Sequence, residues 1–149
     1  DMVGCNSRLD SIQAAVLRIK LRQLDNYIDA RRNVADYYDG ILGSIKGVSI
    51  PFRAHDSKHV FHQYTIKLEG IDRNGLNEYL ASKEIPSMIY YPVPAHRQKM
   101  FAHFGSDATN LPVTDELTTM VISLPIHTEM QDEQLELITS EIIEYIQKK

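Results

Sequence analysis

Hydrophobic residues recur every three to four positions through residues 7–43, which is the spacing of an amphipathic helix. They form two adjoining stripes, Leu9, Ile12, Val16 and Ile19 in one and Leu17, Leu21, Leu24 and Ile28 in the other. No proline interrupts the pattern, which predicts one helix of about 35 residues, or two helices with a break near residues 26–29. Ser7 with Asp10 predicts its N-terminal cap, and Gly40 or Gly43 its end.

A helix of this length exceeds what the core of one small domain needs. Two hydrophobic stripes indicate two contact surfaces. We expect one stripe to face this domain and the other to face a further domain or a second subunit.

After Gly47 the pattern changes to that of strands. Residues 48–50 predict a short strand that ends at Pro51, and residues 59–68 alternate as a half-buried strand does. Its apolar face carries Val60, His62, Tyr64, Ile66 and Leu68. We therefore expect His62 to be a core histidine with a satisfied hydrogen bond.

The C-terminal half alternates between short elements. Asp72 predicts the cap of a helix that runs to about Lys83, and residues 87–91 predict a further strand. Prolines make residues 92–112 a loop with short helical turns, after which residues 114–120 predict a helix and 121–124 a strand. Thr128 with Gln131 opens a last helix, buried along Leu135, Ile138, Ile142 and Ile146.

This order predicts an α+β fold, with a long N-terminal helix followed by a small, largely antiparallel sheet of three to four strands packed by helices. The 149 residues fit a single domain. Within it, residues 1–43 form a polar turn and the long helix, and residues 44–149 form the α+β body.

Composition narrows the function classes. The net charge is −4 and the 16 Lys and Arg residues are scattered, which disfavours a nucleic-acid partner. Cys5 is the single cysteine, so an internal disulfide is excluded. With no signal peptide and no apolar run near the ~20 residues that a membrane span requires, we expect a cytoplasmic protein without a membrane partner.

Asn6 and Arg8 lie in a polar turn directly before the first helix. The Asn6 amide can donate to an anionic oxygen beside the free N–H groups of a helix N-terminus. The Arg8 guanidinium can offer a planar fork to a phosphate or carboxylate. The alternatives are that Asn6 is a turn or cap residue and that Arg8 forms a surface ion pair with Asp10 or Asp1.

Three histidines, at positions 55, 59 and 62, lie close together in the sequence and raise the possibility of a zinc site. They come with no cysteine pair, and the last two face opposite sides of the predicted strand. A metal site is therefore not expected.

Several segments together carry a family resemblance. They are Gly4-x-Asn6-x-Arg8-Leu9-x-x-Ile12-Gln13-Ala14-Ala15-x-Leu17, His62-Gln63-Tyr64-Thr65-Ile66, Ile85-Pro86, Tyr90-Tyr91-Pro92-x-Pro94-x-His96-x-Gln98 and Leu124-Pro125. In this order and spacing the chain resembles the sugar aminotransferases of the DegT/DnrJ/StrS type, which use pyridoxal phosphate. The resemblance covers essentially the whole chain.

The resemblance implies a fold like aspartate aminotransferase, in which a large cofactor domain precedes a smaller C-terminal domain. This chain resembles the second part. The lysine that forms the Schiff base and the acid that pairs with the pyridinium nitrogen precede the Gly-x-Asn-x-Arg turn in the family. We therefore expect neither in this chain, no covalent cofactor and no activity of the chain alone, within a parent more than twice as long.

The resemblance also assigns roles to the candidate residues. It implies that Asn6 reaches the cofactor phosphate across a homodimer and that Arg8 lies near the partner's active site, as a substrate contact. It implies that Tyr90, Tyr91 and His96 border the substrate, where phenol and imidazole can hydrogen-bond a sugar hydroxyl or stack on its ring. The alternative is a loop that only packs its aromatic side chains on the domain surface. Which of the two tyrosines faces inward stays open, because neighbouring strand positions face opposite ways.

The implied reaction transfers an amino group, usually from glutamate, to a keto group of a nucleotide-linked sugar. Residues 63–66 and 90–94 most resemble members that aminate the 3-keto position of a UDP-linked N-acetylhexosamine acid. The alternative is a non-catalytic regulatory or protein-interaction module, because some family members are described as pleiotropic regulators.

Overall fold

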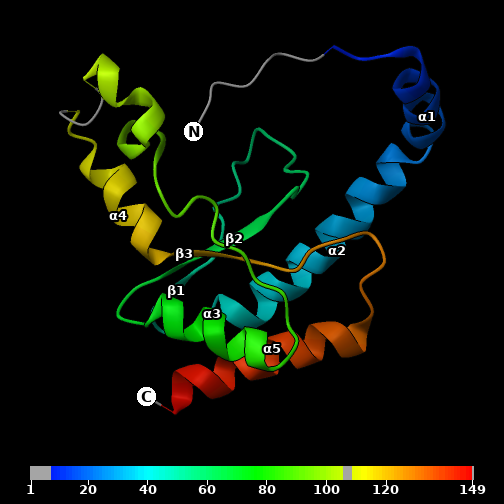
Figure 1. The fold of residues 1–149 in the computed structure, drawn as a ribbon. Helices are drawn as coiled ribbons and strands as arrows, with labels where there is room; N and C mark the ends of the chain where they lie inside the picture. Colours follow the sequence, from blue (N-terminus) through cyan, green and yellow to red (C-terminus); the bar gives the residue numbers. More distant parts are fainter. Residues whose placement is uncertain (1–7, 106–108, 149) are drawn as a thin grey trace.

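The computed structural model describes residues 8–105 and 109–148 of the chain. Figure 1 shows how its helices and strands follow one another along the sequence. They are α1 (Ser11–Leu21), α2 (Leu24–Leu42), β1 (Val48–Ser49), β2 (Tyr64–Leu68), α3 (Arg73–Ser82), η1 (Ala95–Arg97), η2 (Lys99–Phe104), α4 (Pro112–Met120), β3 (Val121–Leu124) and α5 (Asp132–Gln147), where η marks a 3-10 helix. The predicted combination of helices with a small antiparallel sheet is confirmed.

One antiparallel sheet holds the three strands in the order β1, β2, β3. Val48 of β1 pairs with Leu68, and Tyr64 at the other end of β2 pairs with Leu124 of β3. The central strand β2 is therefore paired along both edges. One face of such an antiparallel sheet can pack on the core while the other faces solvent.

The strand predicted over residues 87–91 is wrong. The segment makes one isolated bridge, in which Met88 and Ser123 exchange backbone hydrogen bonds of 3.0 and 2.7 Å. Pro86 and Pro92 flank the segment, and proline has no N–H to donate to a ladder. The segment therefore runs beside β3 without joining the sheet.

The core lies between one face of the sheet and helices α2, α3 and α5, which lie on the same side of it in Figure 1. Tyr64, Ile66 and Leu68 of β2 point into this core and are at most 2% exposed, as their alternation predicts. The helices contribute Val34, Ala35, Tyr38, Leu42, Leu76, Leu80, Leu135, Ile138 and Ile142. Thr65 and Lys67 of β2 are partly exposed and point to the opposite face of the sheet.

The N-terminal helical segment is two helices that separate at Arg22 and Gln23, a few residues before the predicted break. The cap of α1 is Asp10, whose carboxylate accepts a 2.8 Å hydrogen bond from the backbone N–H of Gln13. Ser7 lies outside the described residues. Gly43 follows the last turn of α2, at one of the two predicted ends.

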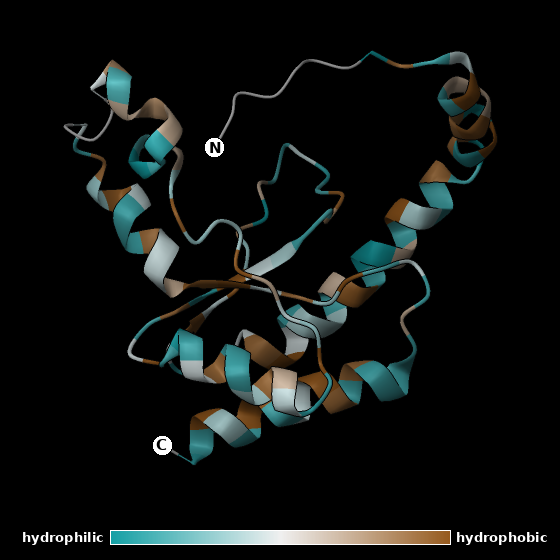
Figure 2. Ribbon diagram, in the orientation of Figure 1, coloured by the Kyte–Doolittle hydropathy of each residue, from teal (hydrophilic) through white to brown (hydrophobic). Residues whose placement is uncertain are grey.

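Helix α1 contains no buried residue. Its hydrophobic side chains are largely exposed, from 49% for Val16 to 79% for Ile12. Figure 2 shows these hydrophobic residues on α1, away from the packed helices of the core. Within the described ranges, no helix combines the length and the hydrophobicity needed to cross a bilayer.

The prediction that His62 is a core residue is wrong, because the strand begins later than its pattern predicts. Phe61 has a positive φ of 46°, a conformation that interrupts a strand. This turn places Phe61 in the core at 1% exposure and leaves Val60 at 46%. His62 is exposed.

The N-terminal cap of α3 is the predicted residue, whereas that of α5 differs from the prediction. Asp72 caps α3 as predicted, since its carboxylate accepts a 2.9 Å hydrogen bond from the N–H of Gly75. Helix α5 begins with a capping box between Gln131 and Gln134. Thr128, which was predicted to open this helix, lies before the box.

Candidate functional site

A hollow of about 520 Å³ lies on the polar face of the sheet, between the loop that follows Met88 and helix α4. Thr65 of β2 and Val121 of β3 contribute from the sheet. The loop contributes Tyr90, Tyr91, Val93, Pro94, Ala95 and Gln98, and α4 contributes Thr114, Leu117 and Thr118. The volume falls in the range of small-molecule sites, roughly 300–1,000 Å³.

Tyr90 and Tyr91 both line this hollow. Their rings meet edge to face with centroids 5.9 Å apart, and Tyr91 is the more exposed at 71% against 38%. Neighbouring residues face opposite ways only in a strand, and residues 90–91 are not in one. Both tyrosines therefore face the hollow.

His96 lies beside the hollow and does not line it. Its side chain is 8% exposed, and its Nε2 lies 3.0 Å from Oδ1 of Asp115 on α4. The neighbouring Arg97 donates from Nη2 to the other oxygen of Asp115, also at 3.0 Å. The hydrogen bond from Arg97, together with the charge of its guanidinium, holds the pKa of Asp115 below its usual value.

Among the described residues, those that line the hollow offer hydroxyl, phenol, amide and apolar groups, and none has a charged side chain. Sequence reasoning missed its threonines. Thr114 and Thr118 could have been found as an i, i+4 pair on one face of a predicted helix. Thr65 could have been found as the polar position between two buried residues of β2.

Arg8 is not brought to this hollow. It is exposed and lies just before α1, which Figure 1 places on the opposite side of the molecule from α4. No ion pair joins it to Asp10, the nearer of its two predicted alternatives. Asn6 and Asp1 lie outside the described residues.

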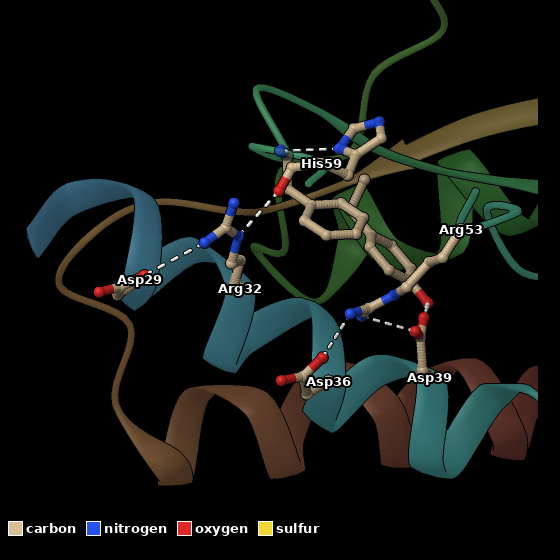
Figure 3. A network of polar contacts seen from close by, with 8 residues as sticks. Asp29, Arg32, Asp36, Asp39, Arg53 and His59 are labelled. Carbon is tan, nitrogen blue, oxygen red and sulfur yellow. Dashed lines mark hydrogen bonds and ion pairs between the residues drawn. The ribbon is translucent and has the colours of Figure 1, made fainter. Parts of the chain in front are cut away.

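The segment between β1 and β2 is fastened to α2 by a polar network that the sequence did not reveal (Figure 3). Arg53 reaches two carboxylates one turn apart on α2, with 2.6 Å from Nη1 to Asp36 and 2.6 Å from Nη2 to Asp39. Its guanidinium also lies over the Phe61 ring, 4.7 Å from the centroid. One cation thus connects the loop, the core and the helix.

Two further contacts complete this network. The Nε of Arg32 donates a 2.9 Å bond to the backbone carbonyl of His59 (Figure 3). The Tyr64 hydroxyl donates a 2.6 Å bond to Asp39. Burial raises the pKa of the Tyr64 phenol, and the bond to Asp39 raises it further, so the hydroxyl stays a donor. The network thus joins the segment that precedes β2, and Tyr64 at the start of β2, to helix α2.

Comparison with known proteins identifies the family. The sequence model of the DegT/DnrJ/EryC1/StrS aminotransferase family matches residues 1–143. The chain belongs to this family.

Three curated relatives span the chain almost completely. It is 40% identical over 95% of its length to UDP-N-acetyl-3-dehydro-alpha-D-glucosamine 3-aminotransferase of Acidithiobacillus ferrooxidans. It is 36% identical over 97% to the pleiotropic regulatory protein of Geobacillus stearothermophilus, and 35% over 95% to dTDP-3-amino-3,6-dideoxy-alpha-D-galactopyranose transaminase of Aneurinibacillus thermoaerophilus. The chain spans 37%, 39% and 38% of these relatives.

Solved structures of the family share the fold. DesV of S. venezuelae, in complex with a ketimine intermediate, matches 97% of this chain and 38% of its own with a TM-score of 0.86 at 32% identity. A family aminotransferase from Brucella abortus matches 96% of this chain and 37% of its own with a TM-score of 0.82 at 35% identity. The α+β architecture is therefore that of sugar aminotransferases.

The hollow does not fit the family's pyridoxal phosphate. Of the residues that the structure describes, no lysine lines it to form a Schiff base and no cationic side chain faces it to receive the phosphate. Within the described ranges, no group of three or more His, Cys, Asp or Glu side chains is placed to hold a metal ion. The groups that do face the hollow suit an uncharged, hydroxyl-bearing ring.

Proposed function

We propose that this chain is the C-terminal, substrate-facing domain of an aminotransferase that transfers an amino group to the 3-keto carbon of a nucleotide-linked hexose. The hollow beside Tyr90 and Tyr91 carries this proposal, because its uncharged polar lining suits a sugar ring. The names of two relatives support the position of the keto group, since both concern carbon 3, one on a UDP sugar and the other on a dTDP sugar.

The residues of this chain bind and orient the sugar. The two tyrosine rings offer apolar faces for stacking and hydroxyls for hydrogen bonds. Thr118 of α4 donates its hydroxyl to the Asp115 carbonyl and Thr65 of the sheet shares a bond with Ser123, so both offer oxygens that can accept a further bond. The half-enclosed hollow removes water from one side of the ring, which strengthens these bonds. Such contacts hold the keto carbon in place for an amino donor, which we propose to be glutamate.

Pyridoxal phosphate supplies the electron sink for amino transfer when it is bound. We propose that the cofactor is held by the remainder of the complete protein, with Asn6 reaching its phosphate and Arg8 the substrate from a neighbouring subunit. The separation of α1 from α4 in Figure 1 supports this division, because Arg8 and the tyrosines then serve two different sites of one homodimer. The enzyme is proposed to work in the cytoplasm.

The exposed face of α1 supports the proposal that this chain works as part of a larger assembly. Leu17 and Leu21 of α1 line an open groove of about 870 Å³ together with Leu24 and Tyr27 of α2 and with Val60. Exposed apolar surface of this extent is characteristic of an interface. We propose that the rest of the complete protein, in its dimer, covers it.

Two measurements test the proposed function. The complete protein with pyridoxal phosphate is expected to convert a UDP- or dTDP-linked 3-keto hexose to the 3-amino sugar, with 2-oxoglutarate formed from glutamate in equal amount. Release of 2-oxoglutarate without the amino sugar, or no reaction with either nucleotide, contradicts the proposal. The 149-residue chain alone is expected to show no pyridoxal absorbance band that borohydride fixes, and a fixed band would overturn the assignment of the lysine to another part of the protein.

A non-catalytic regulatory module is the second candidate function. Its support is the 36% identity to a relative named as a pleiotropic regulatory protein, together with the uncovered face of α1. The amino-transfer assay separates the two candidates, because a regulatory module has no turnover with any nucleotide sugar.

A further inference from the structure

Two walls of the hollow are joined by one carboxylate. The first wall is the loop with η1, and the second is α4. Asp115 in the first turn of α4 lies 3.0 Å from Nε2 of His96 and 3.0 Å from Nη2 of Arg97, both on η1. One oxygen accepts a hydrogen bond from Arg97, and the other is in contact with His96 Nε2, which makes no hydrogen bond of good geometry, so the loop meets Asp115 at two points.

The residues on either side of this attachment face the hollow. Ala95 and Gln98 flank His96 and Arg97 in the loop and line the first wall. Thr114 and Thr118 lie on α4 around Asp115 and line the second wall. The attachment therefore sets the spacing between the two rows of side chains that would contact a bound ring.

The attached groups are themselves withdrawn from the hollow. His96 is 8% exposed and turns its Nε2 toward Asp115, so it is poorly placed to contact a ligand. Asp115 and Arg97 are 35% and 42% exposed and also do not line the hollow.

We propose that Asp115 is a positioning residue, which holds the loop of residues 90–98 against α4 through His96 and Arg97 and thereby sets the width of the hollow. His96 then acts through the loop and does not contact the substrate itself. This inference rests on the proposed function for its catalytic consequence. The attachment of the loop can be measured without any reference to the reaction.

The first test measures the attachment in the 149-residue chain. Trypsin can cleave after Arg97 and after Lys99, and mass spectrometry identifies the new N-termini at Gln98 and Met100. The variant Asp115→Asn is expected to raise the initial rate of these cleavages at least about fivefold, because local opening of the loop becomes more frequent. Glu116→Gln is the matched control, since it removes the same charge from the next, exposed position of α4.

The second test measures positioning in the complete protein. Asp115→Asn is expected to raise KM for the nucleotide sugar roughly tenfold while kcat changes less than about twofold, because the loss falls on substrate binding. The KM for the amino donor serves as an internal control and is expected to stay unchanged. Asp115→Glu, which keeps the charge, is expected to recover most of the loss, whereas a residue that merely supports folding would lower activity toward both substrates alike.

The outcomes separate the two proposals. Equal cleavage rates in Asp115→Asn and Glu116→Gln overturn the attachment, whatever the protein catalyses. Faster cleavage in Asp115→Asn with an unchanged KM for the sugar overturns the positioning role and leaves the proposed function intact. A wild-type protein that transfers no amino group overturns the proposed function and, with it, the catalytic part of this inference.

Discussion

Two aspartates on α2 offer a matched pair for measuring what the network of Figure 3 contributes to stability. Asp36 and Asp39 each lie 2.6 Å from Arg53, but their side chains are 61% and 21% exposed. Asp39 alone also accepts the 2.6 Å bond from the hydroxyl of Tyr64, whose side chain is fully buried. Replacing each by alanine removes the same group from the same helix, so the helix-propensity gain largely cancels in the comparison.

The structure sets different costs for the two changes. An exposed ion pair contributes about 0.2–1 kcal/mol, so Asp36→Ala should lower the free energy of unfolding by about 0.5 kcal/mol. Asp39→Ala also removes the charged acceptor of a buried hydroxyl, which costs about 1.5–3 kcal/mol. We therefore expect Asp39→Ala to be more destabilising than Asp36→Ala by about 2 kcal/mol.

Urea denaturation followed by circular dichroism measures this difference. With a denaturant slope of about 2 kcal/mol per molar, it corresponds to a shift of about 1 M in the midpoint. A double-mutant cycle of Asp39→Ala with Tyr64→Phe should give a coupling free energy of at least about 1 kcal/mol. Equal midpoints for the two alanine variants, or a coupling near zero, would refute the argument that the buried hydroxyl makes Asp39 the more important residue.

Two further predictions concern the backbone and the pH dependence of folding. Gly47→Ala should lower the free energy of unfolding by more than about 1 kcal/mol, because Gly47 has a φ of 84° and a new Cβ would lie 2.7 Å from a backbone oxygen. Gly40→Ala, on the open surface of α2, should raise it by about 0.5–1 kcal/mol. Thermal unfolding that shows the same change for both variants would contradict this prediction. The bond from Tyr79, and then Lys83, lower the pKa of Glu141 in the folded state, so its stabilisation is complete above the unfolded pKa of about 4.3 and is lost as pH falls through the folded value. Glu141→Gln should therefore reduce the loss of stability between pH 6 and pH 3 in urea titrations, and an unchanged loss would count against it.

Local signals in the sequence determined most of the secondary structure. The alternation of Tyr64, Ile66 and Leu68 predicted β2 and its buried face, and Asp72 predicted the start of α3. Such features depend on neighbours within a few positions along the chain, which is why sequence alone carries them. The family resemblance rested in the same way on motifs in a fixed order, and the match over residues 1–143 confirmed it.

Contacts between distant residues decided what the sequence left open or predicted wrongly. His62 is exposed because the positive φ at Phe61 reverses the alternation, in a loop that Arg53 connects to Asp36 and Asp39 of α2. His96 is tied to Asp115, which lies 19 positions away along the chain and contacts it only after the loop folds against α4. Periodicity describes one element at a time and contains no information on how two elements meet, so these side chains could be placed only by the tertiary structure.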